Sequence, residues 1–400
     1  MSQKQIALNA SIKQLKADGY ELEFFQQHFV VRSVPYVRQD KTLDSGAIVC
    51  HCPDFAGSDK PAGGDHTVWF IGEMPCKPDG MPLDMKHPEE VLCKQKLEEG
   101  LIINRRFSNK PSTEGFPNTF YEKIVHYVTL IQNQARAIDS TVNARTGMPF
   151  KVNDETSPFK YQDSSSSRAG IYALSQKLAK KRIAIVGLGG TGGYILDQVA
   201  KTHVAEIHLF DDDEFSTHNA FRAPGAPSFE ELAAKPLKVV HHKALHDPMR
   251  NGIHTHPYKL TAENVNELAG FDFVFVSVDN GESRRLLSSY LIDAKIPFID
   301  VGMGIIKQED PLILHGTCRT TFFSPEKYGH TKLLPCEDDV GENLYRSNIQ
   351  VADLNAMNAI MAVIRWKQYC GFYGDDEMAH NMDYTIGNSS IARRTGPEET

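Results

Sequence analysis

Residues 182–194, with the sequence RIAIVGLGGTGGY, constrain the fold of this chain more than any other segment. An apolar run leads into a turn with five glycines in seven residues, and residues suited to a helix follow. This order predicts a buried strand, a tight turn and a helix start. Such a turn binds phosphate, because converging backbone N–H groups lie beside the positive end of a helix.

The alternation of strands and helices continues to the end of the chain. We expect strands at 182–187, 205–210, 271–278, 296–301 and 312–323, and helices at 192–202, 228–246 and 281–294. The first four strands are nearly continuous apolar runs, which is typical of a parallel sheet buried on both faces. Residues 168–400 are therefore predicted to form an α/β domain with a doubly wound, Rossmann-like and mostly parallel sheet.

Residues 1–150 have a different pattern, which predicts a smaller α+β domain. Apolar residues at helical spacing predict one helix that stops at Gly19 and another at 120–131. Strands are expected at 29–34, 47–50 and 67–71. Residues 151–167, KVNDETSPFKYQDSSSS, are polar and include a serine run, so they predict a linker between the two domains.

The composition excludes several classes of function. The chain has 400 residues and a net charge of −8, so it has no basic footprint for nucleic acid or a membrane surface. No apolar run reaches the roughly 18 residues that a membrane helix needs. The polar N-terminus also lacks the apolar segment of a signal peptide. We therefore expect a cytoplasmic protein that binds neither nucleic acid nor membrane.

Seven cysteines are spread along the chain. An odd number without a signal peptide favours free thiols over a disulfide framework. Cys50, His51 and Cys52 lie close together, but no second pair at zinc-finger spacing accompanies them. The favoured interpretation is a strand end with small buried thiols, and a metal site is the alternative.

The glycines of the turn each have an expected role in binding a nucleotide. Gly187 permits the tight turn, while Gly189 and Gly190 let the backbone approach a phosphate. Gly192 lets the helix pack close to the strand. Asp211 ends the next predicted strand, where an acid binds ribose hydroxyls. These features fit NAD and ATP equally.

Acidic, amide and cationic side chains follow the ribose position and favour ATP. They are Asp213, Asn219, Arg222, and Lys238 or its neighbour Lys235. A hydride-transfer enzyme has no use for two cations and an amide there, whereas nucleotidyl transfer needs the charge at the α-phosphate neutralised and the pyrophosphate held. Asp279 ends another strand at the same edge and is a suitable ligand for Mg²⁺. A dehydrogenase that uses NAD is the alternative.

With these residues, the segment from about 168 to 366 resembles the adenylating domain shared by ubiquitin-activating enzymes and the bacterial ThiF, MoeB and HesA adenylyltransferases. The matching positions are the glycine turn, Asp211, Asp213, Asn219, Arg222, Lys238 (or Lys235), Asp279, Asn280, Arg284 and the segment 350–356. The resemblance implies that ATP and Mg²⁺ adenylate the C-terminal carboxylate of a ubiquitin-like or sulfur-carrier protein that ends in glycine. Arg222, Lys238 and Asp279 would then be catalytic.

The resemblance implies three further features. Arg168 looks like the family's arginine that reaches the ATP of a partner subunit, which implies a homodimer. Cys336 lies roughly where several members carry a cysteine that attacks the activated carboxylate, and an incidental loop thiol is the alternative. The two Cys-x-x-Cys pairs with which many members bind zinc are absent here, so no zinc is expected.

The first 150 residues carry no motif that identifies their role. Some bacterial relatives fuse the adenylating domain to a conjugating-enzyme-like domain, and Cys76 and Cys93 are the thiols available here, but no His-Pro-Asn precedes either. The sequence of residues 1–150 is as compatible with an inactive conjugating-enzyme-like domain or an unrelated docking domain as with an active conjugating domain. A conjugating-enzyme-like or isopeptidase-like partner is a further expectation. For the whole chain, a non-catalytic scaffold that keeps the fold is the remaining alternative.

Overall fold

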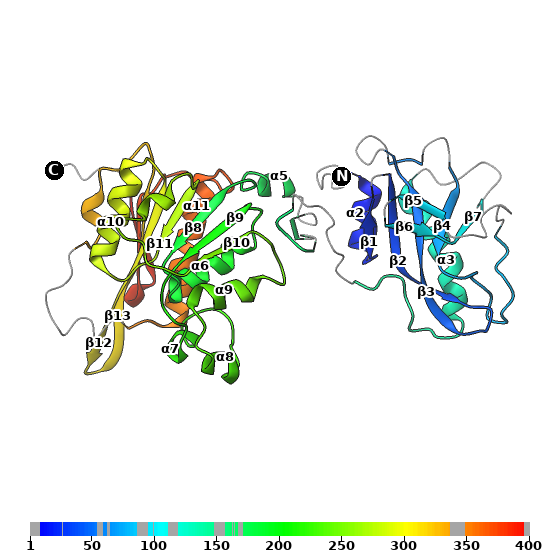
Figure 1. Ribbon diagram of the computed structural model, residues 1–400, viewed down its shortest axis with the longest axis horizontal. Helices are drawn as coiled ribbons and strands as arrows, with labels where there is room; N and C mark the ends of the chain where they lie inside the picture. Colours follow the sequence, from blue (N-terminus) through cyan, green and yellow to red (C-terminus); the bar gives the residue numbers. More distant parts are fainter. Residues whose placement is uncertain are drawn as a thin grey trace. The chain divides into compact units, whose positions relative to one another are not determined.

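The computed structural model describes residues 9–25, 27–53, 59–61, 65–85, 95–98, 100–110, 119–147, 157–161, 163, 165–166, 171–336 and 349–395. Two compact units make up the chain (Figure 1). The first comprises Met1–Thr156 and Lys160–Tyr172, and the second Ser157–Phe159 and Ala173–Thr400. Most of the predicted linker at 151–167 lies outside the described residues.

The N-terminal unit is built on an antiparallel sheet with the order β1-β2-β3-β4-β7. Its strands are β1 (Leu22–Phe24), β2 (His28–Val37), β3 (Leu43–His51), β4 (Thr67–Ile71) and β7 (Arg105–Ser108), and a separate hairpin joins β5 (Gln95–Glu98) to β6 (Leu101–Ile103). The three strands expected from the sequence correspond to β2, β3 and β4. Each is longer than or equal to the apolar run that predicted it.

Two helices are described in this unit, and each begins at a side-chain cap. Asn9 accepts from the Ile12 N–H at the start of α2 (Ala10–Ala17), and Thr119 accepts from the Glu122 N–H at the start of α3 (Phe120–Arg136). The apolar faces of both helices pack into the same core as the sheet. A smaller α+β unit therefore precedes the second one, as the sequence pattern predicts.

The described cysteines of the N-terminal unit, Cys50, Cys52 and Cys76, lie in its interior. Cys50 and Cys52 are fully buried in the core, and burial raises the pKa of Cys50 to about 11. This is the strand end with buried thiols that the sequence favoured. Cys76 is also buried, its Sγ donates to the Met74 carbonyl, and burial raises its pKa. Cys93 lies outside the described residues.

The C-terminal unit contains a sheet with the order β10-β9-β8-β11-β12-β13-β14-β15. Its strands are β8 (Arg182–Val186), β9 (Glu206–Phe210), β10 (Ile253–His256), β11 (Phe273–Val276), β12 (Phe298–Glu309), β13 (Leu312–Phe323), β14 (Asn381–Thr385) and β15 (Ser390–Arg394). Pairings from β10 to β12 are parallel, and those from β12 to β15 are antiparallel. The doubly wound α/β fold is therefore confirmed.

Helices cover both faces of this sheet (Figure 1). The helices described from Tyr172 onward are α5 (Tyr172–Ser175), α6 (Gly190–Ala200), α7 (Thr217–Ala220), α8 (Phe229–Ala233), α9 (Lys238–His246), α10 (Gly281–Asp293), α11 (Ala352–Tyr369) and the short 3₁₀ turns η2 (Val265–Leu268), η3 (Thr331–Leu333) and η5 (Ile386–Asn388). Side chains of α6 and α11 share one core with β8 and β9, and those of α10 and η2 share the other. No helix in the described part of the chain is long and apolar enough to cross a bilayer.

The structure corrects two of the expected elements. The single helix expected at 228–246 is interrupted between α8 and α9, because Lys235 has φ 45° and Pro236 disfavours a helical residue before it. The strand expected at 296–301 continues to Glu309 and forms a long hairpin with β13. Strands β10, β14 and β15 were not predicted, because they are short and largely polar.

Candidate nucleotide-binding site

A cavity of about 590 Å³ lies at the carboxyl ends of the parallel strands. It is lined by the residues that end β8, β9 and β11, by the start of α6, by the start of α10 and by side chains of α11. Doubly wound sheets bind their ligands at this edge. The residues predicted to bind a nucleotide should therefore lie around this cavity.

The glycine turn forms one wall of the cavity. Gly187 has φ 89°, and a Cβ there would lie 2.4 Å from the Ser277 carbonyl oxygen, so no other residue fits. A Cβ on Gly192 would lie 1.9 Å from the Gly187 carbonyl oxygen, which confirms the close packing expected between helix and strand. Both glycines hold α6 against the end of β8.

The two middle glycines differ in what surrounds them. A Cβ on Gly190 would lie 2.3 Å from Asn355 Nδ2 and 2.7 Å from the Arg222 carbonyl oxygen, so this glycine packs against protein. A Cβ on Gly189 would meet nothing within 4 Å, and Gly189 lines the cavity at the N-cap of α6. The open space at a helix N-terminus is suited to a phosphate.

Asp211 ties the end of β9 to the glycine turn. Its Oδ2 accepts from the Leu188 N–H at 2.6 Å, and its Oδ1 accepts from the Asp213 N–H at 3.0 Å. Lys238 Nζ lies 2.5 Å from Asp213 Oδ2 and 3.6 Å from Asp211 Oδ1. Burial raises the pKa of Asp211 even though the Lys238 ammonium acts in the opposite direction. A cation and two carboxylates thus meet beside the turn.

Lys238 and Lys235 occupy different surroundings. Lys238 begins α9, is buried and lines the cavity. Lys235 is exposed and does not line the cavity. Of the two lysines that the sequence left open, the structure brings Lys238 to the other predicted residues.

The segment around α7 carries two unpaired donors. Asn219 is 2 % exposed, its Oδ1 accepts from the Ser216 N–H, and its Nδ2 has no hydrogen-bond partner among the described residues. Arg222 lines the cavity, and its buried Nε also lacks a partner in the described part of the chain. Burial lowers the pKa of Arg222. Buried donors without partners are uncommon in folded proteins, so both of these groups call for an explanation.

Asp279 and Asn280 lie at the end of β11 and line the cavity. Asp279 is exposed, so its carboxylate is accessible to a cation. Asn280 Oδ1 accepts from the Ser283 N–H at 2.8 Å and caps α10. Asn280 therefore acts by holding the helix start at the edge of the cavity.

Cys336 lies beside the cavity rather than in its wall. Its neighbour Pro335 lines the cavity, and the Cys336 carbonyl accepts from Arg285. Burial raises the pKa of the Cys336 thiol, which opposes formation of a thiolate. The residues after it, 337–348, and the predicted Arg168 lie outside the described residues.

An ion cluster around the buried Asp300 was not predicted from the sequence. Asp300 is fully buried and contacts Arg284 Nε at 2.9 Å and Arg319 Nη2 at 2.5 Å. Arg284 also donates to the carbonyls of Val278 and Pro335. The cluster therefore links β11, β12, β13 and the segment before Cys336. In the sequence, only the position of Asp300 as a single acid within the apolar run PFIDV could have indicated this cluster.

Two asparagines of α11 were also not identified. Asn355 Oδ1 accepts from Thr191 Oγ1 at 2.7 Å, and Asn358 Nδ2 donates to the Gly302 carbonyl at 2.9 Å. Both are 1 % exposed and line the cavity. Two amides three residues apart on an apolar helix face were the available signal.

The comparisons with known proteins divide the chain in the same region as the structure. Residues 165–364 match the ThiF family. Residues 10–164 match a domain of unknown function, DUF6791.

Two curated relatives match part of the chain. A tRNA threonylcarbamoyladenosine dehydratase of Haemophilus influenzae is 24% identical over 143 residues, which is 34% of this chain and 52% of the relative. A ubiquitin-like modifier-activating enzyme 5 of Aedes aegypti is 24% identical over 155 residues, which is 34% of this chain and 37% of the relative. The chain thus spans about half or less of the length of these relatives.

Solved structures with a distant likeness include E. coli MccB with ATP, at 16% identity and a TM-score of 0.46, covering 58% of this chain and 72% of that chain. PaaA is another, at 14% identity and a TM-score of 0.45, covering 56% of this chain and 76% of that chain.

Proposed function

Because this chain belongs to the ThiF family, we propose that it adenylates a carboxylate, with ATP as the nucleotide donor. The observation that carries the proposal is the pair of buried donors without described partners on Asn219 and Arg222, of which Arg222 lines the same cavity as Gly189. An acceptor-rich, anionic ligand suits these groups. Hydride transfer does not need the unpaired cationic and amide donors that follow Asp211, the residue expected to bind the ribose. The dehydrogenase alternative is therefore less well supported.

Each group of residues in the cavity has an expected role in adenylation. The Gly189 turn and the α6 N-terminus would bind a phosphate, and Asp211 would accept from ribose hydroxyls. Arg222 and Lys238 would stabilise charge that develops on the α-phosphate when a carboxylate oxygen attacks it and pyrophosphate leaves. Mg²⁺ at Asp279 would supply positive charge for the leaving pyrophosphate.

We further propose that the carboxylate belongs to the C-terminal glycine of a ubiquitin-like or sulfur-carrier protein. One curated relative is named for a ubiquitin-like modifier and the other for a modified tRNA nucleoside. The net charge of −8 favours a protein substrate, because tRNA binding draws on clustered basic residues. A homodimer and a docking role for the N-terminal unit belong to the same proposal.

A thioester at Cys336 is a separate step. The raised pKa of this thiol means that any attack on the activated carboxylate needs a change in its surroundings. Wild type that forms an adduct cleaved by dithiothreitol through thiol exchange, where Cys336→Ala forms none, would establish the step. An adduct of equal yield in both proteins would exclude Cys336.

The test of the proposed function is the exchange of labelled pyrophosphate into ATP, with candidate carrier proteins that end in glycine. We expect exchange that depends on the carrier and is lost when its last glycine is removed. NAD binding without ATP binding would support a dehydrogenase instead. ATP binding without exchange for any carrier would support a non-catalytic scaffold and contradict the proposal.

A further inference from the structure

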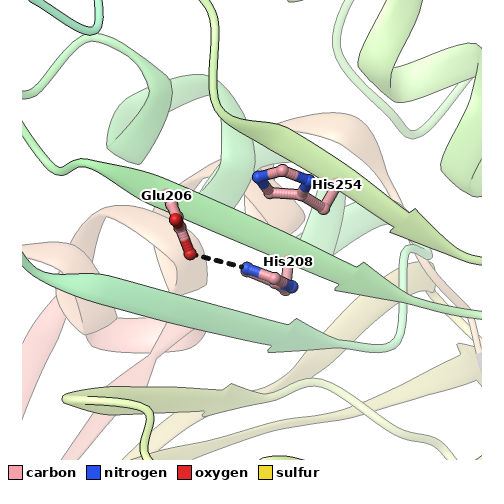
Figure 2. Close-up of side chains that lie close together, drawn as sticks. All are labelled: Glu206, His208 and His254. Atoms are coloured by element: carbon pink, nitrogen blue, oxygen red, sulfur yellow. Dashed lines mark hydrogen bonds and ion pairs between the residues drawn. The ribbon is translucent and has the colours of Figure 1, made fainter. Parts of the chain in front are cut away.

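Strands β9 and β10 carry a group of metal-binding side chains outside the nucleotide cavity. Glu206 and His208 are two residues apart on β9, and His254 is the register partner of His208 on β10. Because side chains alternate along a strand, all three project from one face of the sheet. Figure 2 shows the Glu206 carboxylate meeting the His208 ring, with His254 on the neighbouring strand.

We propose that Glu206, His208 and His254 bind a divalent transition-metal ion, for which zinc is the candidate. Two imidazole nitrogens and one carboxylate oxygen form a ligand set typical of zinc, with a fourth position open to water. His254 is exposed, so the ion is accessible from solvent. This site is unrelated to the Cys-x-x-Cys pairs whose absence predicted no zinc.

The distances suit such an ion. In a tetrahedral zinc site with bonds of about 2.0–2.1 Å, neighbouring ligand atoms lie about 3.3 Å apart. His208 Nε2 lies 3.2 Å from Glu206 Oε2, and the three ligand atoms all lie within 4.8 Å of one another. The rings of His208 and His254 are stacked at 4.6 Å. A rotation of the exposed His254 side chain is the adjustment needed to complete the triangle.

A chain of hydrogen bonds supports His208 from behind. His208 Nδ1 lies 2.9 Å from His256 Nε2, and His256 Nδ1 lies 2.9 Å from the Tyr258 hydroxyl. The hydroxyl donates to Glu267 at 2.5 Å. Ligating histidines in metal sites are held by such contacts at their second ring nitrogen.

Arg182 is compatible with this arrangement. Its Nε donates to Glu206 Oε2 at 2.8 Å, as hydrogen-bonding partners of a ligating carboxylate do. Bound metal would join β10, the edge strand, to β9. It would also hold in place the hydrogen-bond chain from His208 through His256 to Tyr258, a residue that lines the nucleotide cavity.

The test is zinc and cobalt binding by the full chain, purified without a histidine tag and freed of metal by chelation. We expect calorimetry to show a single tight zinc site in wild type and in the control His315→Ala, whose ring contacts Gln308 on the β12–β13 hairpin. The His254→Ala variant should lose this site. The His256→Gln variant should weaken it by about 10–100-fold.

Two results would overturn the proposal. One is zinc affinity in His254→Ala and Glu206→Gln equal to that of wild type. The other is a cobalt spectrum dominated by thiolate charge-transfer bands, which would place the ion at cysteines. Because His254 is exposed, its alanine variant should fold, and circular dichroism can confirm this before binding is compared.

Discussion

The unpaired Nε–H of Arg222 is the residue-scale feature that most directly predicts a ligand. It is buried, it lies at a cavity wall, and no described group accepts from it. We expect Arg222→Ala to lower carrier-dependent pyrophosphate exchange by about 10²–10³-fold, the effect of removing one preorganised donor from a transition state. Thermal stability should stay close to wild type, because the lost guanidinium was poorly solvated.

The control for this prediction is Lys235→Ala, which removes an exposed cation of the same segment outside the cavity. Its exchange rate should match wild type. Equal losses in both variants would mean that general charge, rather than the cavity, supports exchange.

The glycine turn offers a second residue-scale prediction, from two changes of identical size. Gly189→Ala adds a methyl group to open space, so the fold should persist while ATP affinity falls. Gly192→Ala forces a Cβ against the Gly187 carbonyl and should lower the free energy of unfolding by about 1–3 kcal/mol or more. Urea unfolding and ATP titration of both variants separate the two effects. Wild-type ATP affinity in Gly189→Ala would contradict the phosphate assignment.

Asp211 predicts how nucleotide binding depends on pH. Burial raises its pKa, and only the ionised carboxylate accepts fully from Leu188 and from a ribose. ATP affinity should therefore fall as the pH is lowered, beginning at a higher pH than for an ordinary aspartate with a pKa of about 3.9. Calorimetric titrations over a pH series measure this. Asp211→Asn should bind weakly with a flatter profile, and an equally steep profile in that variant would rule out Asp211 as the titrating group.

At the scale of elements, the Asp300 cluster connects β12 to α10 and β13 next to the site. Its carboxylate is shared by Arg284 of α10 and Arg319 of β13. Asp300→Ala leaves the buried Arg284 and the partly buried Arg319 without their anion, so we expect the free energy of unfolding to fall by about 3–5 kcal/mol. Urea denaturation gives this value, with the exposed Asp376→Ala as the control. A loss no larger than that of the control would show that the cluster adds little to stability.

The elements themselves were predictable to different degrees. Long apolar runs identified β8, β9 and β11 because burial on both faces leaves a continuous apolar pattern. Pro236 indicated the break between α8 and α9, but the helical spacing of the apolar residues around it favoured one continuous helix. The edge strand β10 carries His254 and His256 instead of an apolar run, so nothing in its periodicity marked it.

For the whole molecule, the candidate site was largely predictable where residues follow strand ends. Parallel strands bring their carboxyl ends to one edge, so Asp211 and Asp279 line one cavity although they are far apart in sequence. Asp300 and Asn355 were missed because their partners come from distant segments, and only three-dimensional packing pairs them. The N-terminal unit carries no comparable motif, and its role stays a proposal.

The central claim is that a carboxylate oxygen attacks the α-phosphorus of ATP. The most direct test labels the C-terminal carboxylate of the carrier protein with heavy oxygen and follows the AMP that is released when an acceptor takes the activated carrier. We predict that mass spectrometry will find the heavy oxygen in the phosphate of AMP, and that Arg222→Ala will release little AMP. AMP that carries only solvent oxygen, or release of ADP and phosphate, would contradict adenylation as the function of this site.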